Sequence, residues 1–128
     1  MENYGFIYKT TNLLTGKFYI GKKAYLYKVK KKLTKKQLAL QTKGRKKRFE
    51  TVIVESNWRG YYGSSAKLKE DIEECGRENF KIEVLKECVD SISLTYWEIY
   101  YQMTNRVLFE DTYNDNIAGK FYRGRVKT

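Results

Sequence analysis

The stretch that decides the fold runs from Tyr4 to Lys23 and reads YGFIYKTTNLLTGKFYIGKK. Two apolar runs that contain tyrosine, residues 5–8 (GFIY) and 18–21 (FYIG), flank a polar segment of Thr, Asn and Gly. Such residues favour turns because they bond to the local backbone or accept unusual dihedral angles. Aromatic and β-branched runs on each side of a turn are typical of a β-hairpin. The sequence therefore predicts a hairpin here.

The alternation of side chains along a strand places the two tyrosines of this hairpin. Tyr8 points to the face opposite to Ile7, and Tyr19 points to the face opposite to Ile20. The two tyrosines therefore share one face of the hairpin if the pairing register of the strands permits it.

Length and composition limit the class of protein. A chain of 128 residues is one domain by size, and 41% hydrophobic with 16% aromatic residues is enough to fold. The sequence contains neither a long apolar run nor a basic segment followed by an apolar one, which argues against a transmembrane helix and a secretory signal. Cys75 and Cys88 do not form a metal-binding pair, and we expect free thiols in a reducing cytoplasm.

The charge is concentrated in one segment. The net charge is +11, from 26 basic and 15 acidic residues, which suggests a polyanionic partner. Between residues 22 and 48 there are 13 basic residues and no acidic one, whereas residues 70–115 contain 12 acidic and 4 basic residues. We therefore expect a basic patch that contacts phosphates, rather than a solvated lysine face.

The chain contains no histidine. This absence excludes nucleases of the HNH type, catalytic Cys-His and Ser-His-Asp arrangements, and metal sites built on histidine. Acid–base chemistry must come from tyrosine, lysine or carboxylate side chains.

Further elements follow the hairpin. The patterns predict a helix over residues 34–43 with Thr34 as N-cap and Gly44 at its end, then a short strand over residues 49–54. Residues 58–65 form a turn into a helix that is capped by Ser64 or Ser65 and ends at Gly76. Alternating residues 80–86 predict another strand.

A last helix is expected from about Ser93, as its cap, to Phe109. Apolar residues occupy two stripes of this helix, which predicts that it is largely buried. Glu98 is the only acidic residue between Asp90 and Glu110. A carboxylate on an apolar stripe is costly unless it is paired or binds a metal, so Glu98 is either a metal ligand or a structural partner of a lysine.

The two triplets of the hairpin resemble the signature of the GIY-YIG nuclease family. Gly5, Ile7 and Tyr8 match the first triplet, with Phe6 inserted, and residues 19–21 match the second. Between the two triplets, residues 11–12 (TN) and 16–17 (GK) also resemble the family. The run at residues 58–65 resembles small stand-alone members of phage type, and residues 76–80 extend the resemblance over most of the chain.

The resemblance implies a fold and a domain organisation. We expect an α/β (α+β) fold with a small three-stranded antiparallel sheet flanked by helices. The chain, residues 1–128, would form a single nuclease domain with a lysine-rich insertion at about residues 23–57, which is the poorly matched part.

The resemblance also implies catalytic residues. Tyr8 would deprotonate or orient the attacking water, with Tyr19 holding the hydrogen-bond network or exchanging roles with it. Glu98 matches the glutamate that binds one divalent metal, Mg²⁺ or Mn²⁺. Asn114, after Tyr113, matches the final phrase of the family, with Asn116 as a nearby competitor. A tyrosine acting as a base would need a neighbouring cation to lower its pKa.

The catalytic cation is less well placed by the resemblance. The family has an arginine soon after the second triplet, where this chain has the insertion. The candidates are Arg45, Arg48 and Arg59, of which we take Arg48 as the catalytic cation. Lys22 or Lys23 is an alternative. The residues expected to bind DNA are Lys22, Lys23, Lys30, Lys31, Lys32, Lys35, Lys36, Arg45, Lys46, Lys47 and Arg59. The basic tail at residues 120–128 would add phosphate contacts or be frayed.

The expected function is metal-dependent hydrolysis of DNA phosphodiester bonds, with a phage homing or host-directed role implied by resemblance. The partner would be double-stranded DNA, bound by a monomer or a homodimer in the cytoplasm of a bacterial host. The alternative is a non-catalytic basic module that binds nucleic acid. A nuclease of the PD-(D/E)xK type is excluded because Leu85, not lysine, stands two residues after Glu83. A structural basic protein explains neither the two triplets nor Glu98.

Overall fold

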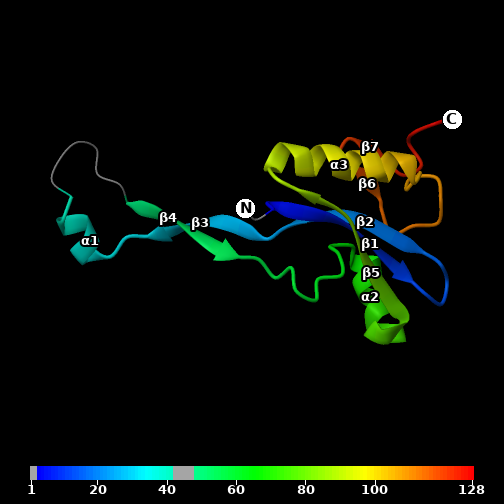
Figure 1. Ribbon diagram of the computed structural model, residues 1–128, viewed down its shortest axis with the longest axis horizontal. Coiled ribbons are helices and arrows are strands. Elements are labelled where there is room, and N and C mark those ends of the chain that lie inside the picture. The colour runs from blue at the N-terminus through cyan, green and yellow to red at the C-terminus, as the bar shows by residue number, and fades with distance from the viewer. Residues whose placement is uncertain (1–2, 42–47) are drawn as a thin grey trace. The chain divides into compact units, whose positions relative to one another are not determined.

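The expected hairpin forms the centre of the fold. In the computed structural model, which describes residues 3–41 and 48–128, β1 (Gly5–Asn12) pairs antiparallel with β2 (Phe18–Ala24). β5 (Phe80–Cys88) pairs antiparallel with the other side of β1, so that the sheet order is β2-β1-β5 (Figure 1). The prediction of an α+β fold around a three-stranded antiparallel sheet is confirmed.

The chain divides into two units that are described separately. We call Met1–Tyr25 together with Asn57–Thr128 the sheet unit, and Leu26–Ser56 the ribbon unit. All the fully buried residues belong to the sheet unit among the positions that the structure describes. None of the described helices has the length and hydrophobicity that crossing a bilayer requires.

The register of the hairpin places both tyrosines on one face. Tyr8 lies opposite Gly21, and Thr10 lies opposite Tyr19. Because directly opposed residues share a face, Tyr8 and Tyr19 point to the same side as diagonal neighbours. Their ring centroids are 6.1 Å apart, which confirms the predicted shared face.

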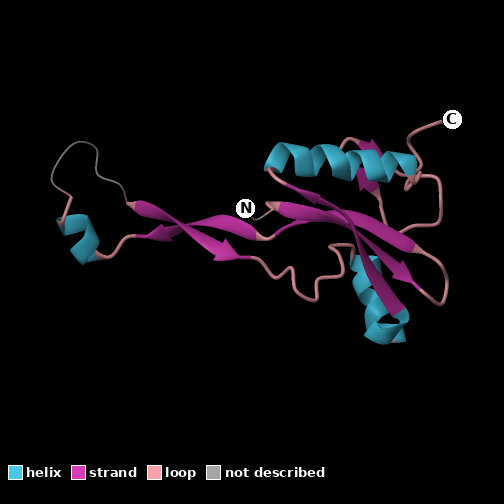
Figure 2. Cartoon of the chain, viewed as in Figure 1, coloured by secondary structure: helices cyan, strands magenta, loops and turns pink. Residues whose placement is uncertain are grey.

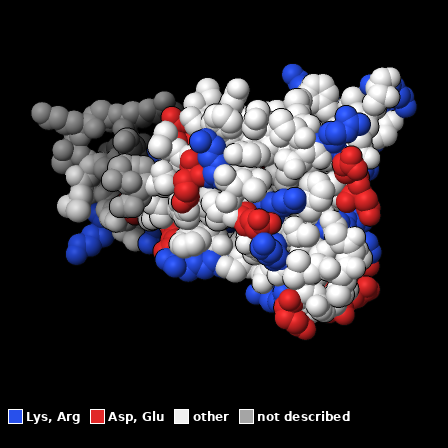
Figure 3. Space-filling view, turned by 45° about the vertical axis from the view of Figure 1, so that its right-hand side comes forward, with Lys and Arg blue, Asp and Glu red and all other residues white. Residues whose placement is uncertain are grey.

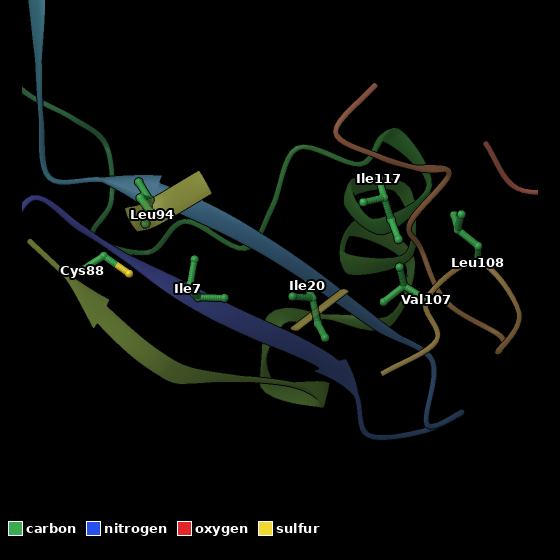
Figure 4. Packing of buried hydrophobic residues seen from close by; sticks show 7 residues of the cluster. All are labelled: Ile7, Ile20, Cys88, Leu94, Val107, Leu108 and Ile117. Atoms are coloured by element: carbon green, nitrogen blue, oxygen red, sulfur yellow. The ribbon is translucent and has the colours of Figure 1, made fainter. Parts of the chain in front are cut away.

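The other face of the sheet packs against α3 (Ser91–Thr104) and the chain that follows it. Ile7 and Ile20 point to this side and are completely buried (Figure 4). The cluster that they form consists of Ile7, Ile20, Cys88, Leu94, Val107, Leu108 and Ile117. Burial of these apolar side chains is the main stabilising contribution to the sheet unit.

The tyrosine face packs against α2 (Ala66–Cys75). Ser65 caps α2 by accepting a hydrogen bond from the Leu68 backbone N–H, and Gly76 ends the helix, as predicted. Leu68 forms a second buried cluster with Phe80 and Tyr113. A short 3₁₀ helix, Arg77–Asn79, leads from α2 into β5.

α3 differs from the prediction in its bounds. It begins at Ser91, because Asp90 rather than Ser93 is the N-cap and accepts a hydrogen bond from the Ser93 backbone N–H. It ends at Thr104 rather than Phe109, because the chain turns at Arg106, whose φ is 52°. Two short strands, β6 (Asn116–Ile117) and β7 (Phe121–Tyr122), pair after it.

The prediction that α3 is largely buried was also wrong. Only Leu94 and Gln102 of α3 are fully buried, whereas Tyr96 is 61% exposed and Tyr100 and Met103 are also exposed. Burial on all sides of a helix requires cover on each side. The second apolar stripe is covered only in part: Ile99 packs against the core, whereas Tyr96, Tyr100 and Met103 face outwards.

Two glycines of the hairpin are required by close packing. A Cβ atom at Gly5 would lie 2.5 Å from the Lys23 carbonyl oxygen and 3.0 Å from a methyl group of Leu94. A Cβ atom at Gly21 would lie 2.8 Å from the hydroxyl oxygen of Tyr8 and 2.8 Å from the ring of Tyr19. The glycines of the two triplets therefore allow α3 to approach the sheet and the two tyrosines to lie side by side.

The ribbon unit contains a two-stranded antiparallel ribbon, β3 (Leu26–Lys32) and β4 (Phe49–Glu55), and the short α1 (Lys35–Ala39) (Figure 2). β4 confirms the expected strand, whereas β3 was not predicted because its lysines are disfavoured in strands. Thr34 caps α1 in a capping box with Gln37. The helix ends at Ala39, earlier than predicted, and the predicted last residue Lys43 and stop Gly44 lie outside the described residues.

Two aromatic residues of the sheet unit that flank the ribbon unit in sequence contact each other. Tyr25 precedes the ribbon unit and Trp58 follows it closely, and their rings contact edge to face with centroids 4.9 Å apart. The Tyr25 ring also packs against Phe6, with centroids 5.1 Å apart. The sheet unit thus brings these two flanking residues together by its own contacts.

We expect the sheet unit to fold when Leu26–Ser56 is replaced by a short Gly-Ser linker. Both buried clusters remain in this variant, and a shorter loop between the adjacent ends costs less closure entropy. Thermal melting followed by circular dichroism should show one cooperative transition within about 5 °C of the full-length protein, since few stabilising contacts are removed. Loss of the transition would show that the core depends on the ribbon unit.

Candidate active site

A polar hollow of about 600 Å³ lies at the outer edge of β2. The strand β2 contributes Tyr19 and Lys22, and α3 contributes Glu98 and Gln102. The complete lining is Tyr19, Lys22, Ser64, Ser65, Ala66, Thr95, Glu98, Gln102, Asn114, Asp115, Asn116 and Ala118, all in the sheet unit. Segments that are far apart in sequence thus meet at one strand.

The hollow exists because side chains pair with the free edge of β2. The Ile20 backbone N–H donates to Asn114 Oδ1 over 3.0 Å, and the Ile20 carbonyl accepts from Asn114 Nδ2 over 2.8 Å and from Gln102 Nε2 over 2.9 Å. An unpaired strand edge that is buried must find partners for its backbone groups. Asn114 and Gln102 supply them and hold β2 against α3 and the C-terminal segment.

Glu98 is half-buried beside this edge. Burial raises the pKa of its carboxyl group, while the Lys22 ammonium and the Lys22 backbone N–H act in the opposite direction. Glu98 takes part in none of the ion pairs between described residues. The lysine that acts on Glu98 is thus Lys22, but the two side chains form no direct ion pair in the described part of the chain.

Lys22 is the only Lys or Arg among the residues that line the hollow. Its ammonium donates a hydrogen bond to Thr95 Oγ1 over 2.9 Å, which fixes the side chain along α3. Lys22 is therefore the cation that the structure places beside Glu98.

Tyr19 lines the hollow, whereas Tyr8 lies behind it. The Tyr19 hydroxyl is hydrogen-bonded to Ser64 Oγ over 2.9 Å. Tyr8 is only 1% exposed, and its ring contacts Tyr61 edge to face with centroids 6.0 Å apart. Of the two tyrosines in the triplets, Tyr19 is the one whose side chain meets the hollow.

Burial raises the pKa of both Tyr8 and Tyr19, and the neighbouring Tyr19, Tyr61 and Glu98 raise the pKa of Tyr8 further. This direction is opposite to the one that general-base catalysis by a phenolate requires. Both side chains are therefore neutral hydroxyl groups in this structure and act as hydrogen-bond partners.

The other predicted cations lie elsewhere. The Lys23 ammonium stands 4.0 Å from the centre of the Tyr61 ring, and Arg59 stacks on Trp58 at 4.2 Å. Neither lines the hollow. Arg48 belongs to the ribbon unit, as do the remaining predicted DNA-binding residues, of which Arg45, Lys46 and Lys47 lie outside the described residues.

The structure separates the two candidate asparagines. Asn114 is 3% exposed and is committed to the Ile20 backbone, so it acts as a positioning residue for β2. Asn116 accepts a hydrogen bond from the Gly119 backbone N–H over 2.9 Å, which is a local turn contact. Asn114 therefore reaches the edge of β2, whereas the Asn116 side chain serves the local turn, and the catalytic role of Asn114 stays a prediction.

Two residues of this region were missed from the sequence. Gln102 follows Glu98 by one helical turn, and its Oε1 atom is buried without a hydrogen-bond partner in the described structure. The sequence feature that could have indicated Gln102 is that it is a second polar residue on an apolar stripe of the helix. Arg123, expected in a frayed or phosphate-binding tail, instead donates to the carbonyls of Asn114 (2.9 Å) and Glu110 (3.0 Å) and holds the segment that carries Asn114.

The donor set of the hollow fits a hard divalent cation. No group of three or more His, Cys, Asp or Glu residues that could enclose a metal occurs within residues 3–41 and 48–128. Mg²⁺ is commonly bound through one or two carboxylates, with water and substrate phosphates completing its shell. Glu98 and Asp115 are the carboxylates of the hollow, and its other donors are oxygen atoms of amide and hydroxyl groups.

Comparison with known proteins identifies one related family. A family model described as "Putative endonuclease segE, GIY-YIG domain" matches residues 1–126. Neither a curated protein nor a solved structure matches the chain. The family match covers the ribbon unit as well as the sheet unit.

We expect Glu98→Gln to raise the melting temperature at neutral pH in the presence of a chelator. Because the folded-state pKa of Glu98 is raised, the unfolded chain loses this proton first, and stability falls as the pH rises through the window between the two pKa values. The amide of Gln cannot ionise and so avoids this loss of stability. The gain in melting temperature should therefore be present at pH values above both pKa values and vanish below about pH 4, where the carboxyl is neutral in the folded and the unfolded state.

Each 1 kcal/mol gained corresponds to about 4 °C in a domain of this size. Glu73→Gln, on the exposed side of α2, is the matched control and should give the same small change at both pH values. A lower melting temperature of Glu98→Gln than of the wild type at neutral pH would instead support Glu98 as a structural partner of a lysine.

Proposed function

This chain belongs to the GIY-YIG nuclease family, and we propose that it is a divalent-metal-dependent endonuclease that hydrolyses phosphodiester bonds of double-stranded DNA. Family membership makes it a nuclease with a nucleic-acid substrate. The observation that carries the proposal is the half-buried carboxylate of Glu98, without an ion-pair partner in the described part of the chain, in one hollow with Lys22 and Tyr19.

Glu98 would hold the metal ion, and Asp115, the other carboxylate of the lining, would contact its water shell. When bound, the ion would supply positive charge that stabilises the anionic transition state and the leaving oxygen. A single protein carboxylate is sufficient because the substrate phosphate is itself a ligand of magnesium in such sites. Burial raises the pKa of Glu98, so ionising its carboxyl group without a nearby cation is costly. A bound cation would offset this cost.

Lys22 and Tyr19 would act on the substrate directly. The Lys22 ammonium, held by Thr95, can donate to a non-bridging phosphate oxygen and stabilise charge as it develops there. The Tyr19 hydroxyl, held by Ser64, can accept from or donate to the attacking water and fix its approach. This assigns to Lys22 the cation role that the sequence suggested for Arg48, and to Tyr19 the role that it suggested for Tyr8.

Tyr8 and Asn114 would position these groups rather than touch the substrate. Tyr8 supports the Tyr19 ring from behind, in space that Gly21 leaves open. Asn114, with Gln102, holds the β2 backbone between Tyr19 and Lys22. The two β2 side chains that face the hollow are therefore fixed through the Ile20 backbone, which lies with Gly21 between them.

The alternative function, a non-catalytic module that binds nucleic acid, does not account for a carboxylate placed beside the one cation of the hollow. A phage homing or host-directed role rests on the resemblance of residues 58–65 to phage-type members. The hollow of one protomer would cut one strand at a time, so cleavage of both strands requires a homodimer or two successive nicks.

We expect the purified protein to nick or linearise supercoiled plasmid with Mg²⁺ or Mn²⁺ and to leave it intact with a chelator. In Glu98→Gln, cleavage should fall by about three decades or more, because metal charge stabilisation contributes several kcal/mol. DNA affinity should stay the same or rise, since a negative charge near the phosphate is removed. Intact plasmid with both metals, on several DNA sequences, would contradict the enzymatic function.

We expect Tyr19→Phe to lower the cleavage rate by about two to four decades with little change in DNA affinity, because only a hydroxyl group that orients the reaction is lost. Tyr8→Phe should have the smaller effect, since its hydroxyl lies behind Tyr19. Tyr96→Phe, on the exposed side of α3, is the control and should match the wild type. A larger loss of cleavage rate in Tyr8→Phe than in Tyr19→Phe would show that Tyr8, not Tyr19, orients the attacking water.

A further inference from the structure

We propose that the β3–β4 ribbon is a DNA-binding element that enters the major groove with one face. This face, called the lysine face below, consists of Lys28, Lys30, Lys32, Phe49, Thr51 and Ile53. The inference deepens the proposed function and rests on it, because it names the element, the face and the groove through which the nuclease would hold duplex DNA.

The strand register defines the lysine face. Lys28 lies opposite Ile53, Lys30 opposite Thr51, and Lys32 opposite Phe49. Alternation along each strand puts these three pairs on the same side of the ribbon. The side chains of β3 therefore form a row of positive charges spaced by about 6.6 Å, two strand residues apart, beside a row of one hydroxyl and two apolar side chains from β4.

The opposite face of the ribbon has a different character. Lys31 on that side lies opposite Glu50, an acidic cross-strand neighbour, and Val29 lies opposite Val52. Val52 is partly shielded, whereas Ile53 on the lysine face is 64% exposed. On the lysine side the remaining pair is Leu26 opposite Glu55, so this side carries three lysines and one glutamate, whereas the opposite face carries one lysine and one glutamate. The excess positive charge of the two strands thus lies on the lysine face.

The positive charge of the protein resides largely in this unit. Leu26–Ser56 contains 11 basic and 2 acidic residues, so it carries +9 of the net +11. Within the residues that the structure describes, Lys28, Lys30 and Lys32 form no ion pair. A row of lysines without acidic partners is complementary to a phosphate backbone, where each contact releases a counterion.

The ribbon lacks a core of its own. None of the described residues of the ribbon unit is fully buried, and all seven residues of β3 are exposed. An isolated two-stranded hairpin is marginally stable in water and normally requires a third strand or a helix to cover one face. An element of this kind gains its missing contacts when a partner covers it, and the charge identifies that partner as a polyanion.

The dimensions favour duplex DNA over duplex RNA. The two strands are about 4.8 Å apart, and each strand, with its seven residues, is about 23 Å long. The major groove of B-form DNA, about 12 Å wide, admits a two-stranded ribbon. The major groove of A-form RNA is deep and narrow and does not admit side chains in this way. Thr51, Ile53 and Phe49 would then lie toward base edges, with thymine methyl groups as apolar partners.

The test compares two triple variants of the full-length chain for binding to a short DNA duplex in chelator. Lys28→Gln with Lys30→Gln and Lys32→Gln neutralises the lysine face. Lys31→Gln with Lys35→Gln and Lys36→Gln removes the same charge from the opposite face and α1. With each lysine contacting one phosphate, the slope of log affinity against log salt should become shallower by about 2.7 in the first variant and by less than half of that in the control.

Equal slopes for the two variants would overturn the proposal, because charge alone would then explain binding. A thermal melt of each variant verifies that the sheet unit is unchanged. Since binding is measured without metal, the result is independent of cleavage. If the wild type cuts plasmid but the first variant has the same salt slope as the wild type, only the proposal for the ribbon is refuted. If the wild type does not cut plasmid but the slope of the first variant is shallower, only the nuclease assignment is refuted.

The groove is tested on the same duplex at saturating protein with dimethyl sulfate, which methylates guanine N7 in the major groove and adenine N3 in the minor groove. We expect protection of guanine N7 that is lost in the first triple variant, with adenine N3 unprotected. The affinity for a duplex RNA of the same sequence should be at least about tenfold lower, a difference of about 1.4 kcal/mol. Protection of adenine N3 only, or equal affinity for RNA, would overturn the major-groove assignment.

Discussion

The backbone of one residue, Ile20, is the constraint on which the site depends. Its N–H and carbonyl face the open edge of the sheet, and they are paired by Asn114 and Gln102 instead of another strand. Leaving such buried groups unpaired would cost about 1–3 kcal/mol each. The same two contacts bring α3 and the C-terminal segment to the edge of β2, and the hollow forms where these three elements meet.

This arrangement explains why the second triplet has its particular composition. Ile20 points into the core, so the residues on each side of it are fixed by its burial. Gly21 leaves the space in which the rings of Tyr8 and Tyr19 lie together. A larger residue at that position would meet both tyrosines, and the hydroxyl of Tyr19 would no longer stand beside Ser64. The triplet is thus a packing solution as well as a chemical one.

The sequence allowed those features to be predicted that depend on local pattern. The hairpin, the third strand β5 and the capped helix α2 follow from alternation and from cap residues, and the position of Glu98 follows from its isolation on an apolar stripe. The shared face of the two tyrosines depended on register, which alternation alone leaves open. The exposed stripe of α3 could not be predicted, because periodicity reports apolar faces but not how many of them a three-stranded sheet can cover.

The chemistry of individual side chains was harder to predict than their positions. Whether a tyrosine is a phenolate base depends on its burial and its neighbours, and here burial and Glu98 both raise the pKa of Tyr8. The cation beside Glu98 is Lys22, two residues past Ile20 on the same face, although the sequence also offered arginines far along the chain. Arg123 illustrates the same limit, since a basic tail residue proved to bind backbone carbonyls of its own chain.

The distribution of charge separates chemistry from affinity. The sheet unit carries 15 basic and 13 acidic residues, and basic and acidic side chains are interspersed over it toward the right of Figure 3. A nearly neutral surface around a carboxylate keeps the local potential moderate, so that a divalent cation is not repelled from Glu98. A surface with nine excess positive charges would repel that cation but attract DNA. Because these requirements conflict at one surface, placing the excess charge in the ribbon unit would allow the proposed metal-binding carboxylate and the proposed DNA-binding element to occur in the same short chain.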